Sequence, residues 1–251
     1  MTRFAVLSDI HGNRWALEAV LADIQARRVD QLINLGDIVY GPLDPEATAH
    51  LLRALDIPST AIWGNEDRVL FEDNAETTSH SSLEFTRSNL TTDSLDWLSR
   101  FPRQAAVDDI YLTHGIPGDD ETYLTEKVDS RGARMRPPGE IRSLLRNVEA
   151  RLVLCGHSHL ARNVQVPGGP LVLNPGSVGL PAYSDDLPHP HIMEAGSPRA
   201  RYALAEKTKA GWSTELVALD YDWETAAGTA ERHGRPDWAH ALRTGRALQD
   251  S

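Results

Sequence analysis

The chain has 251 residues, and its 41% hydrophobic content suffices for a sizeable buried core. Acidic residues outnumber basic ones by 36 to 25, and the formal net charge of −11 argues against non-specific nucleic-acid binding through clustered lysine and arginine. The single cysteine, Cys155, excludes internal disulfides, and no apolar run approaches the roughly 18 residues of a membrane span. We therefore expect a globular cytoplasmic protein without a membrane partner, in which metal ions would supply positive charge for an anionic ligand.

The first part of the sequence predicts three buried strands, each followed by polar residues. An apolar run from Phe4 ends at Asp9 and His11, and because side chains alternate along a strand, these two can face one ion. The next two runs end in Gly36-Asp37 and in Gly64-Asn65-Glu66-Asp67. The predicted elements are a strand from residue 4, a helix at 14–28, a strand at 31–35, a helix near 44–55 and a strand at 59–63.

The middle of the sequence predicts two further strand ends that carry polar residues. A strand at 109–113 ends in His114, and a strand at 151–155 ends in Gly156-His157-Ser158-His159. Residues 67–103 are polar, and we expect them to cover one face of the molecule. The other predictions are helical patches at 83–90 and 94–100, a strand at 104–107, a loop at 116–136 and a helix near 139–149.

The last part of the sequence predicts antiparallel strands and terminal helices. Residues 180–199 are rich in proline and glycine and predict a long loop excursion, which could serve as a lid, a specificity loop or an oligomer contact. The other elements are a hairpin of 163–166 with 170–173, an antiparallel pair of 201–205 with 212–219, and two short helices within 222–247. We expect a single domain over residues 1–251, with the C-terminal helices packed on it.

Five apolar runs thus end in residues that can bind metal, and a glycine stands beside each group. In an open α/β fold, the carboxyl ends of mostly parallel strands converge on one crevice, where ligands bind. The alternative interpretation, core histidines and helix-capping aspartates, would have to hold independently at every strand end. The candidate metal ligands are Asp9, His11, Asp37, Asn65, His114, His157 and His159.

This donor set predicts two divalent metal ions. Two carboxylates and five neutral donors are too many for one tetrahedral zinc ion, but they suit two ions of five or six ligands that share one aspartate. Two such ions lower the pKa of a bound water and clamp phosphoryl oxygens during an in-line attack, so no side-chain nucleophile is required. Mixed nitrogen and oxygen donors accept manganese, iron, nickel and zinc, of which we expect manganese first.

The motifs, in order, are Asp9-x-His11, Gly36-Asp37, Gly64-Asn65-x-Asp67, His114 and Gly156-His157-x-His159. This succession resembles the calcineurin-like metallophosphoesterase superfamily, above all its small prokaryotic branch of broad-specificity phosphodiesterases, to which Asn174-Pro-Gly-Ser177 and the C-terminal helices are also similar. The resemblance implies an α/β fold in which two mixed β-sheets pack as a sandwich flanked by helices. It also implies one ion held by Asp9, His11 and His159, the other held by Asn65, His114 and His157, and Asp37 as the bridge.

One position departs from the family pattern. Many members carry a histidine after the Gly-Asn pair, where it stabilises the transition state or protonates the leaving group, and this chain has Glu66. A carboxylate beside phosphate is repelled, turned outward or held protonated, so the acid would come from elsewhere, with His80, His189 and His191 as candidates. We therefore expect a preference for good leaving groups. The catalytic candidates, acting through a metal-bridging hydroxide, are Asp37, Asn65 and His114, with Glu66 as a further candidate.

Four other polar residues lie close to these motifs in the sequence. Asp67 is expected to orient a ligand or its loop. Asn13 either does the same or caps the helix that follows it. Asn174 and Ser177 either approach the surroundings of the metals or only shape a turn.

The expected activity is metal-dependent hydrolysis of phosphate esters, most of all diesters, with a small-molecule substrate. A phosphomonoesterase with the same centre is one alternative, because dianionic monoesters favour extra basic groups. A non-catalytic binding scaffold is another, but that interpretation predicts the loss of metal-binding residues at some ligand positions, and all of these positions keep one. Nucleic acid is disfavoured as a partner, and the sequence leaves a homo-oligomer open. The candidate basic groups are Arg68, Arg87, Arg131, Arg134 and Arg136.

Overall fold

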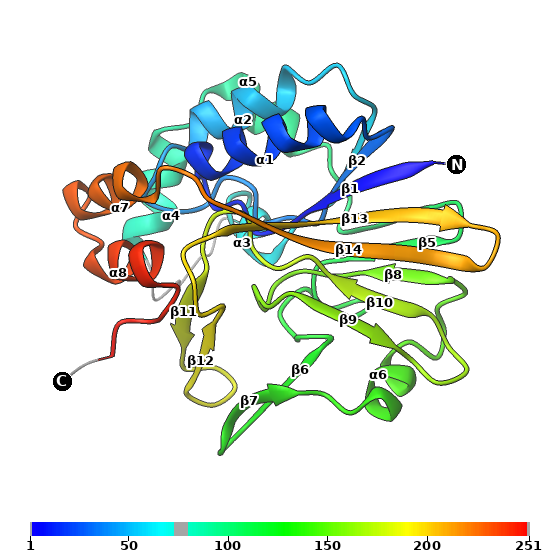
Figure 1. Ribbon diagram of the computed structural model, residues 1–251. Coiled ribbons are helices and arrows are strands. Elements are labelled where there is room, and N and C mark those ends of the chain that lie inside the picture. Colours follow the sequence, from blue (N-terminus) through cyan, green and yellow to red (C-terminus); the bar gives the residue numbers. More distant parts are fainter. Residues whose placement is uncertain (1, 73–79, 250–251) are drawn as a thin grey trace.

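Two mixed five-stranded sheets form the centre of the molecule (Figure 1). The structure is a computed structural model that describes residues 2–72 and 80–249. The first sheet contains, in spatial order, β14 (Gly211–Leu219), β13 (Ala200–Thr208), β1 (Arg3–Leu7), β2 (Gln31–Asn34) and β3 (Ser59–Ala61). The second contains β4 (Gln104–Val107), β5 (Ile110–Thr113), β8 (Leu152–Leu154), β10 (Leu171–Asn174) and β9 (Arg162–Gln165).

Helices flank this pair of sheets. The helices are α1 (Arg14–Arg27), α2 (Pro45–Arg53), α3 (Asn65–Val69), α4 (His80–Ser88), α5 (Thr92–Leu98), α6 (Pro138–Leu144), α7 (Trp223–Arg232) and α8 (Pro236–Thr244). In Figure 1, α1, α2 and α5 lie above the first sheet, α6 lies beside the second, and α7 and α8 pair at one end of the molecule. None of the helices in the described part has the length and apolar character needed to cross a bilayer.

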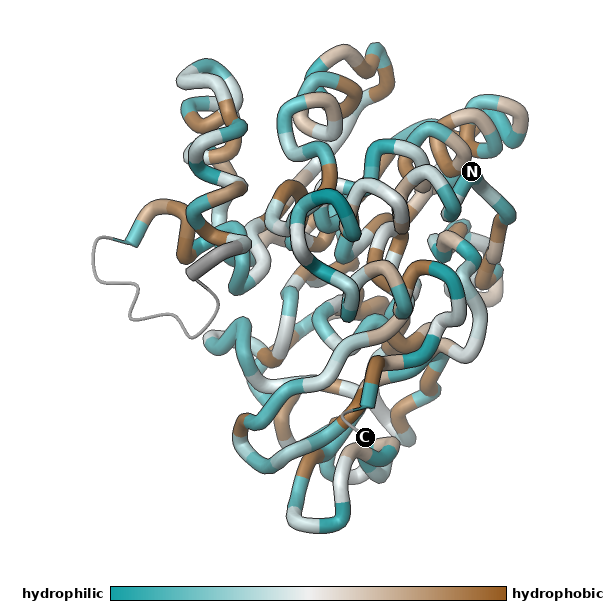
Figure 2. The backbone as a smooth tube through the Cα atoms, turned by 90° about the vertical axis from the view of Figure 1, so that its left-hand side faces the viewer, coloured by the Kyte–Doolittle hydropathy of each residue, from teal (hydrophilic) through white to brown (hydrophobic). Residues whose placement is uncertain are grey.

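The core lies in separate layers on the two faces of the first sheet. On β1, Ala5 and Leu7 pack against the helical layer, whereas Phe4 and Val6 pack between the sheets with residues such as Leu154 of β8. This alternation is the period of two that a strand imposes, and full burial of each large apolar side chain contributes about 1.5–3 kcal/mol. Along the helices, hydrophobic and hydrophilic segments alternate in Figure 2, as expected for helices with one buried face. The predicted sandwich flanked by helices is confirmed.

Two segments predicted as loops contain β-hairpins. Residues 116–136 include β6 (Glu126–Asp129) and β7 (Gly132–Met135), and residues 180–199 include β11 (Ala182–Asp185) and β12 (His191–Glu194). Each strand has four residues and carries polar or charged side chains, so neither the length nor the hydrophobic alternation of a strand was visible in the sequence. The predictions of a loop at 116–136 and of a loop excursion at 180–199 therefore missed a hairpin in each segment.

Other boundaries differ by a few residues. The helix predicted near 139–149 ends at Leu144, because the chain turns after it and the Val148 N–H bonds back to the Leu145 carbonyl at 2.9 Å. The helix predicted at 83–90 begins earlier, at His80. The antiparallel pair β13 and β14 is longer than predicted, with nine residues in each strand.

Candidate metal centre

The seven predicted ligands lie just beyond the ends of strands of both sheets. Strands β1, β2 and β3 are parallel neighbours, as are β5 and β8, so within each sheet these carboxyl ends lie along one edge. After strands of the first sheet come Asp9, His11 and Asp37 on loops and Asn65 at the start of α3, and loops of the second sheet carry His114, His157 and His159. The two sets meet directly, because the His157 backbone N–H donates to Asp9 Oδ1 at 3.2 Å.

The backbone at five of these ligands is left-handed. Residues other than glycine rarely have a positive φ, and the conformation costs about 1–2 kcal/mol for each, so it persists where the surrounding contacts impose it. The affected residues, with φ between 52° and 68°, are Asp9, His11, Asp37, His157 and His159. The loops therefore hold these side chains in place with a strained backbone, which is typical of functional sites.

The first group of ligands brings two imidazole rings together through their Nε2 atoms. His11 Nδ1 lies 3.2 Å from the Tyr40 carbonyl and His159 Nδ1 lies 2.6 Å from the Leu180 carbonyl. Because a carbonyl only accepts, both Nδ1 atoms carry the proton, and in the neutral rings both Nε2 atoms present lone pairs. These Nε2 atoms are only 3.0 Å apart, and His159 Nε2 is 3.4 Å from Asp9 Oδ1. A proton or a cation must therefore lie between them.

The second group has the same design. His114 Nδ1 donates to the Leu35 carbonyl at 2.7 Å, which leaves its Nε2 facing Asp37 Oδ2 at 3.2 Å. His157 Nε2 donates to the Glu121 carbonyl at 2.8 Å, which leaves its Nδ1 as the unprotonated nitrogen. The backbone thus fixes the tautomer of each ring, as is usual for histidines that bind metal.

Three buried atoms of the predicted ligands have no hydrogen-bond partner. They are Asp9 Oδ2, Asn65 Oδ1 and His114 Nε2. An unsatisfied buried polar group costs about 1–3 kcal/mol, and a bound cation would remove that cost. Two triads offer ligand atoms within 4.8 Å of one another, namely Asp9 with His11 and His159, and Asp37 with His114 and His157. The residues present therefore fit divalent metal ions.

The charges in the site shift its pKa values strongly. Burial alone would lower the pKa of His11 and His114, but nearby carboxylates, chiefly Glu66 for His11 and Asp37 for His114, raise these values to about 9 and about 10. Burial, helped by the charge of His114, lowers the pKa of His157 to about 4. Burial would raise the pKa of Asp37, but His114 outweighs it and holds this pKa well below its usual range. Without metal, protons on His11 and His114 balance the carboxylates.

Comparison with known proteins decides the family. The sequence profile of the calcineurin-like phosphoesterase superfamily domain matches residues 2–194. The chain belongs to this superfamily. Its members are phosphoesterases that generally bind divalent metals, so the family indicates metal-dependent phosphoester hydrolysis.

Relatives cover almost the whole of this phosphoesterase. It is 26% identical over 249 residues to an uncharacterized protein of Methanocaldococcus jannaschii, with 93% of this chain and 94% of the relative covered. A solved metallophosphoesterase from Sphaerobacter thermophilus is 25% identical, with 97% of this chain and 100% of the other covered and a TM-score of 0.74. A hypothetical protein from Pyrococcus horikoshii OT3 is 18% identical and shares the fold, with a TM-score of 0.75 and coverages of 99% and 100%.

Four further residues of the phosphoesterase support the loops that carry the ligands. Buried Asp67 accepts from the backbone N–H groups of Ile38 and Gly64, and burial raises its pKa to about 7. Asn13 caps α1 and also donates to the Gly179 carbonyl at 2.9 Å, so both roles considered for it are present. Asn174 donates to the Gly156 carbonyl, and the Ser177 hydroxyl donates to the Asp9 carbonyl at 2.7 Å. Asn174 and Ser177 thus hold backbone on either side of the ligands.

Sequence reasoning missed two tyrosines. Tyr123 stacks on the His157 ring with the centroids 4.4 Å apart, and Tyr183 of β11 meets the His159 ring edge-on at 4.6 Å. The Tyr183 hydroxyl is 3.0 Å from the His157 carbonyl, and the two tyrosine hydroxyls are 2.9 Å apart. Both residues lie in the segments that were predicted to be loops, and no periodicity marked them.

The loop histidines considered as acids do not share one environment. His191 is buried, with Nε2 2.9 Å from the Tyr123 hydroxyl and Nδ1 2.8 Å from the His189 carbonyl, so both nitrogens are engaged away from the metal ligands. His189 is exposed on the turn between β11 and β12. The side chain of His80 lies outside the described residues.

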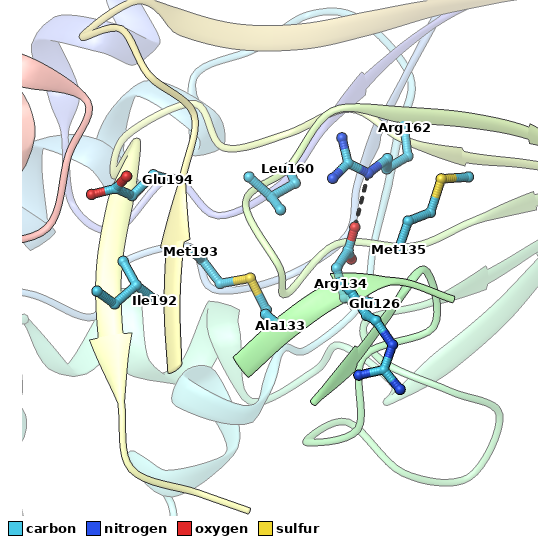
Figure 3. A pocket seen from close by; sticks show the side chains of 9 residues that line it. All are labelled: Glu126, Ala133, Arg134, Met135, Leu160, Arg162, Ile192, Met193 and Glu194. Carbon is cyan, nitrogen blue, oxygen red and sulfur yellow. Dashed lines mark hydrogen bonds and ion pairs between the residues drawn. The ribbon is translucent and has the colours of Figure 1, made fainter. Parts of the chain in front are cut away.

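A cavity of about 240 Å³ lies between the two hairpins rather than among the ligands (Figure 3). Leu160, which directly follows the ligand His159, contributes to its wall, and the Arg162–Glu126 ion pair closes one side at 3.0 Å. Met193 of β12 points toward it from the other hairpin, and Ile192 lines its edge. The wall of this cavity is partly apolar and partly charged, and it includes the residue that follows a predicted ligand in the sequence.

Proposed function

We propose that this protein hydrolyses phosphodiesters at a centre of two divalent metal ions, of which manganese is our first candidate. The observation that carries the proposal is the convergence of ring nitrogens that no backbone carbonyl engages with buried, unpartnered oxygens. When bound, two such ions lower the pKa of a water and neutralise phosphoryl oxygens. One ion would be held by Asp9, His11 and His159, the other by Asn65, His114 and His157, and Asp37 would be shared.

The chain's own contribution is to hold these groups in place before substrate arrives. Backbone carbonyls fix the rings of His11, His114 and His159 through their Nδ1–H groups. Asp37 Oδ1 accepts the Glu66 backbone N–H at 2.9 Å, which orients the carboxylate. Such preorganisation means that little rearrangement is needed while charge develops in the transition state.

The basic side chains favour a diester over a monoester. A dianionic monoester would benefit from further cations beside the metals, but all five candidate arginines have other partners. Arg68 is held by Asp120, Glu121 and Glu72, and Arg87 donates to backbone carbonyls. Arg131 and Arg134 pair with Asp129, and Arg136 pairs with Glu140. With these arginines engaged elsewhere, the metal ions alone would balance the substrate's charge, and a monoanionic diester needs less positive charge than a dianionic monoester.

The leaving group sets a second expectation. His191 uses both ring nitrogens elsewhere and is a poor source of a proton for the departing oxygen. We therefore expect aryl diesters, whose leaving oxygens need little protonation, to be cleaved faster than alkyl diesters. Equal rates on the two classes would contradict this expectation.

The test is hydrolysis of paired aryl phosphate monoesters and diesters by metal-stripped protein titrated with Mn²⁺. We expect Mn²⁺ to restore diesterase activity in the wild type and in Asp96→Asn, an exposed control on α5. Asp37→Asn should lose at least about 100-fold in activity, because it weakens the hold on both ions. Faster monoester turnover would make the protein a monoesterase, and a metal-loaded wild type inactive on both would point to a binding role.

A further inference from the structure

Glu66 is turned toward the centre and not away from it. It lies in the first turn of α3, whose preceding residue, Gly64, passes so close to Asp37 that an added Cβ would lie 2.0 Å from Asp37 Oδ1. This close approach brings the Glu66 side chain beside the ligands, with Oε2 3.0 Å from His11 Nδ1. Of the three arrangements considered for a carboxylate at this position, outward rotation is absent.

The inward oxygen of Glu66 has no hydrogen-bond donor of its own. The one N–H of His11 Nδ1 lies between two acceptors, the Tyr40 carbonyl at 3.2 Å and Glu66 Oε2 at 3.0 Å, so this buried carboxylate oxygen shares its donor with a carbonyl. A buried carboxylate oxygen without a donor of its own is costly, so it calls for a proton or a cation. His11, Asp37 and Glu66 offer ligand atoms within 4.8 Å of one another, which is close enough for a third triad that shares His11 with the first and Asp37 with the second.

We propose that Glu66 is an additional carboxylate ligand of the ion held by His11 and Asp37, an inference that rests on the two-metal centre proposed above. The histidine that many family members carry at this position is neutral or cationic, whereas Glu66 adds a negative charge and a hard oxygen donor. Hard donors favour manganese over zinc. Two divalent ions with three carboxylates keep a net charge of roughly +1 before the bridging hydroxide is counted, one unit less than with a neutral residue at position 66, which favours a monoanionic diester over a dianionic monoester.

The experiment measures Mn²⁺ binding by isothermal titration calorimetry in wild type, Glu66→Gln and Glu72→Gln. Glu72→Gln is the matched control, because it removes one carboxylate just beyond α3 that pairs with Arg68 at 2.7 Å. We expect Glu66→Gln to weaken one of the two sites by at least about tenfold and the control to leave both unchanged. Visible spectra of the Co²⁺-loaded proteins report the same ligand directly, since loss of one donor changes the absorption bands.

The outcomes separate this inference from the proposed function. If wild type and Glu66→Gln bind two Mn²⁺ ions with equal affinity and give identical Co²⁺ spectra, Glu66 is not a ligand, and the two-metal centre stands. If wild type binds no Mn²⁺, both proposals fall. The melting temperature of the metal-free variant shows whether it is folded, and a folded variant with one weakened site and an altered spectrum supports the ligand role.

Discussion

Binding of two metal ions should release about two protons near neutral pH. In the metal-free protein, the pKa of His11 is raised to about 9 and that of His114 to about 10, so at pH 7.5 both rings carry an extra proton. Each ring must lose it to offer Nε2 to a metal. His157 adds nothing, because its pKa is lowered to about 4 and its ring is already neutral. The apparent affinity for each ion should therefore rise about tenfold per pH unit between pH 6.5 and 8.5.

Calorimetric titration with Mn²⁺ in several buffers of different ionisation enthalpy measures the number of protons released on binding. The slope of the observed heat against buffer enthalpy should correspond to about two protons for the wild type. His114→Gln should release about one proton fewer, since the replaced ring no longer carries one. An affinity independent of pH over this range, with no buffer dependence of the heat, would refute the assignment of protons to these rings.

Two further predictions concern stability. In metal-free protein, the raised pKa values of His11 and His114 contribute stability that is complete below about pH 6.5 and is lost as pH rises through 9 and 10, so urea midpoints should fall between pH 7 and 10. Gly64→Ala would place a Cβ 2.0 Å from Asp37 Oδ1 and should cost about 1–3 kcal/mol of unfolding free energy, together with weaker Mn²⁺ binding. Gly139→Ala in α6, where nothing lies within 4 Å, is the control and should not destabilise the protein.

The family and the fold could be predicted because their signals are local and repeated. Asp9, Asp37 and His114 each lie within three residues of the end of a strand, and parallel strands deliver such residues to one edge whatever the intervening segments do. The direction of the Glu66 side chain could not be predicted, because it depends on how closely Gly64 approaches the neighbouring loop. Nor could the stacking of Tyr123 on a ligand ring, which depends on a contact between segments far apart in the sequence.

Each of the two ligand groups draws on both sheets. His11 follows β1 and His159 follows β8, and their facing nitrogens are separated by 148 residues of chain. Bringing such distant points together has an entropic cost, which only the packing of the folded protein offsets, so the pocket does not exist in the unfolded chain. An ion held there would cross-link the two sheets, and it would bind only at the end of folding. The melting temperature would rise with ion concentration, and a chelator would weaken the contact between the two sheets before it affected the structure within either sheet.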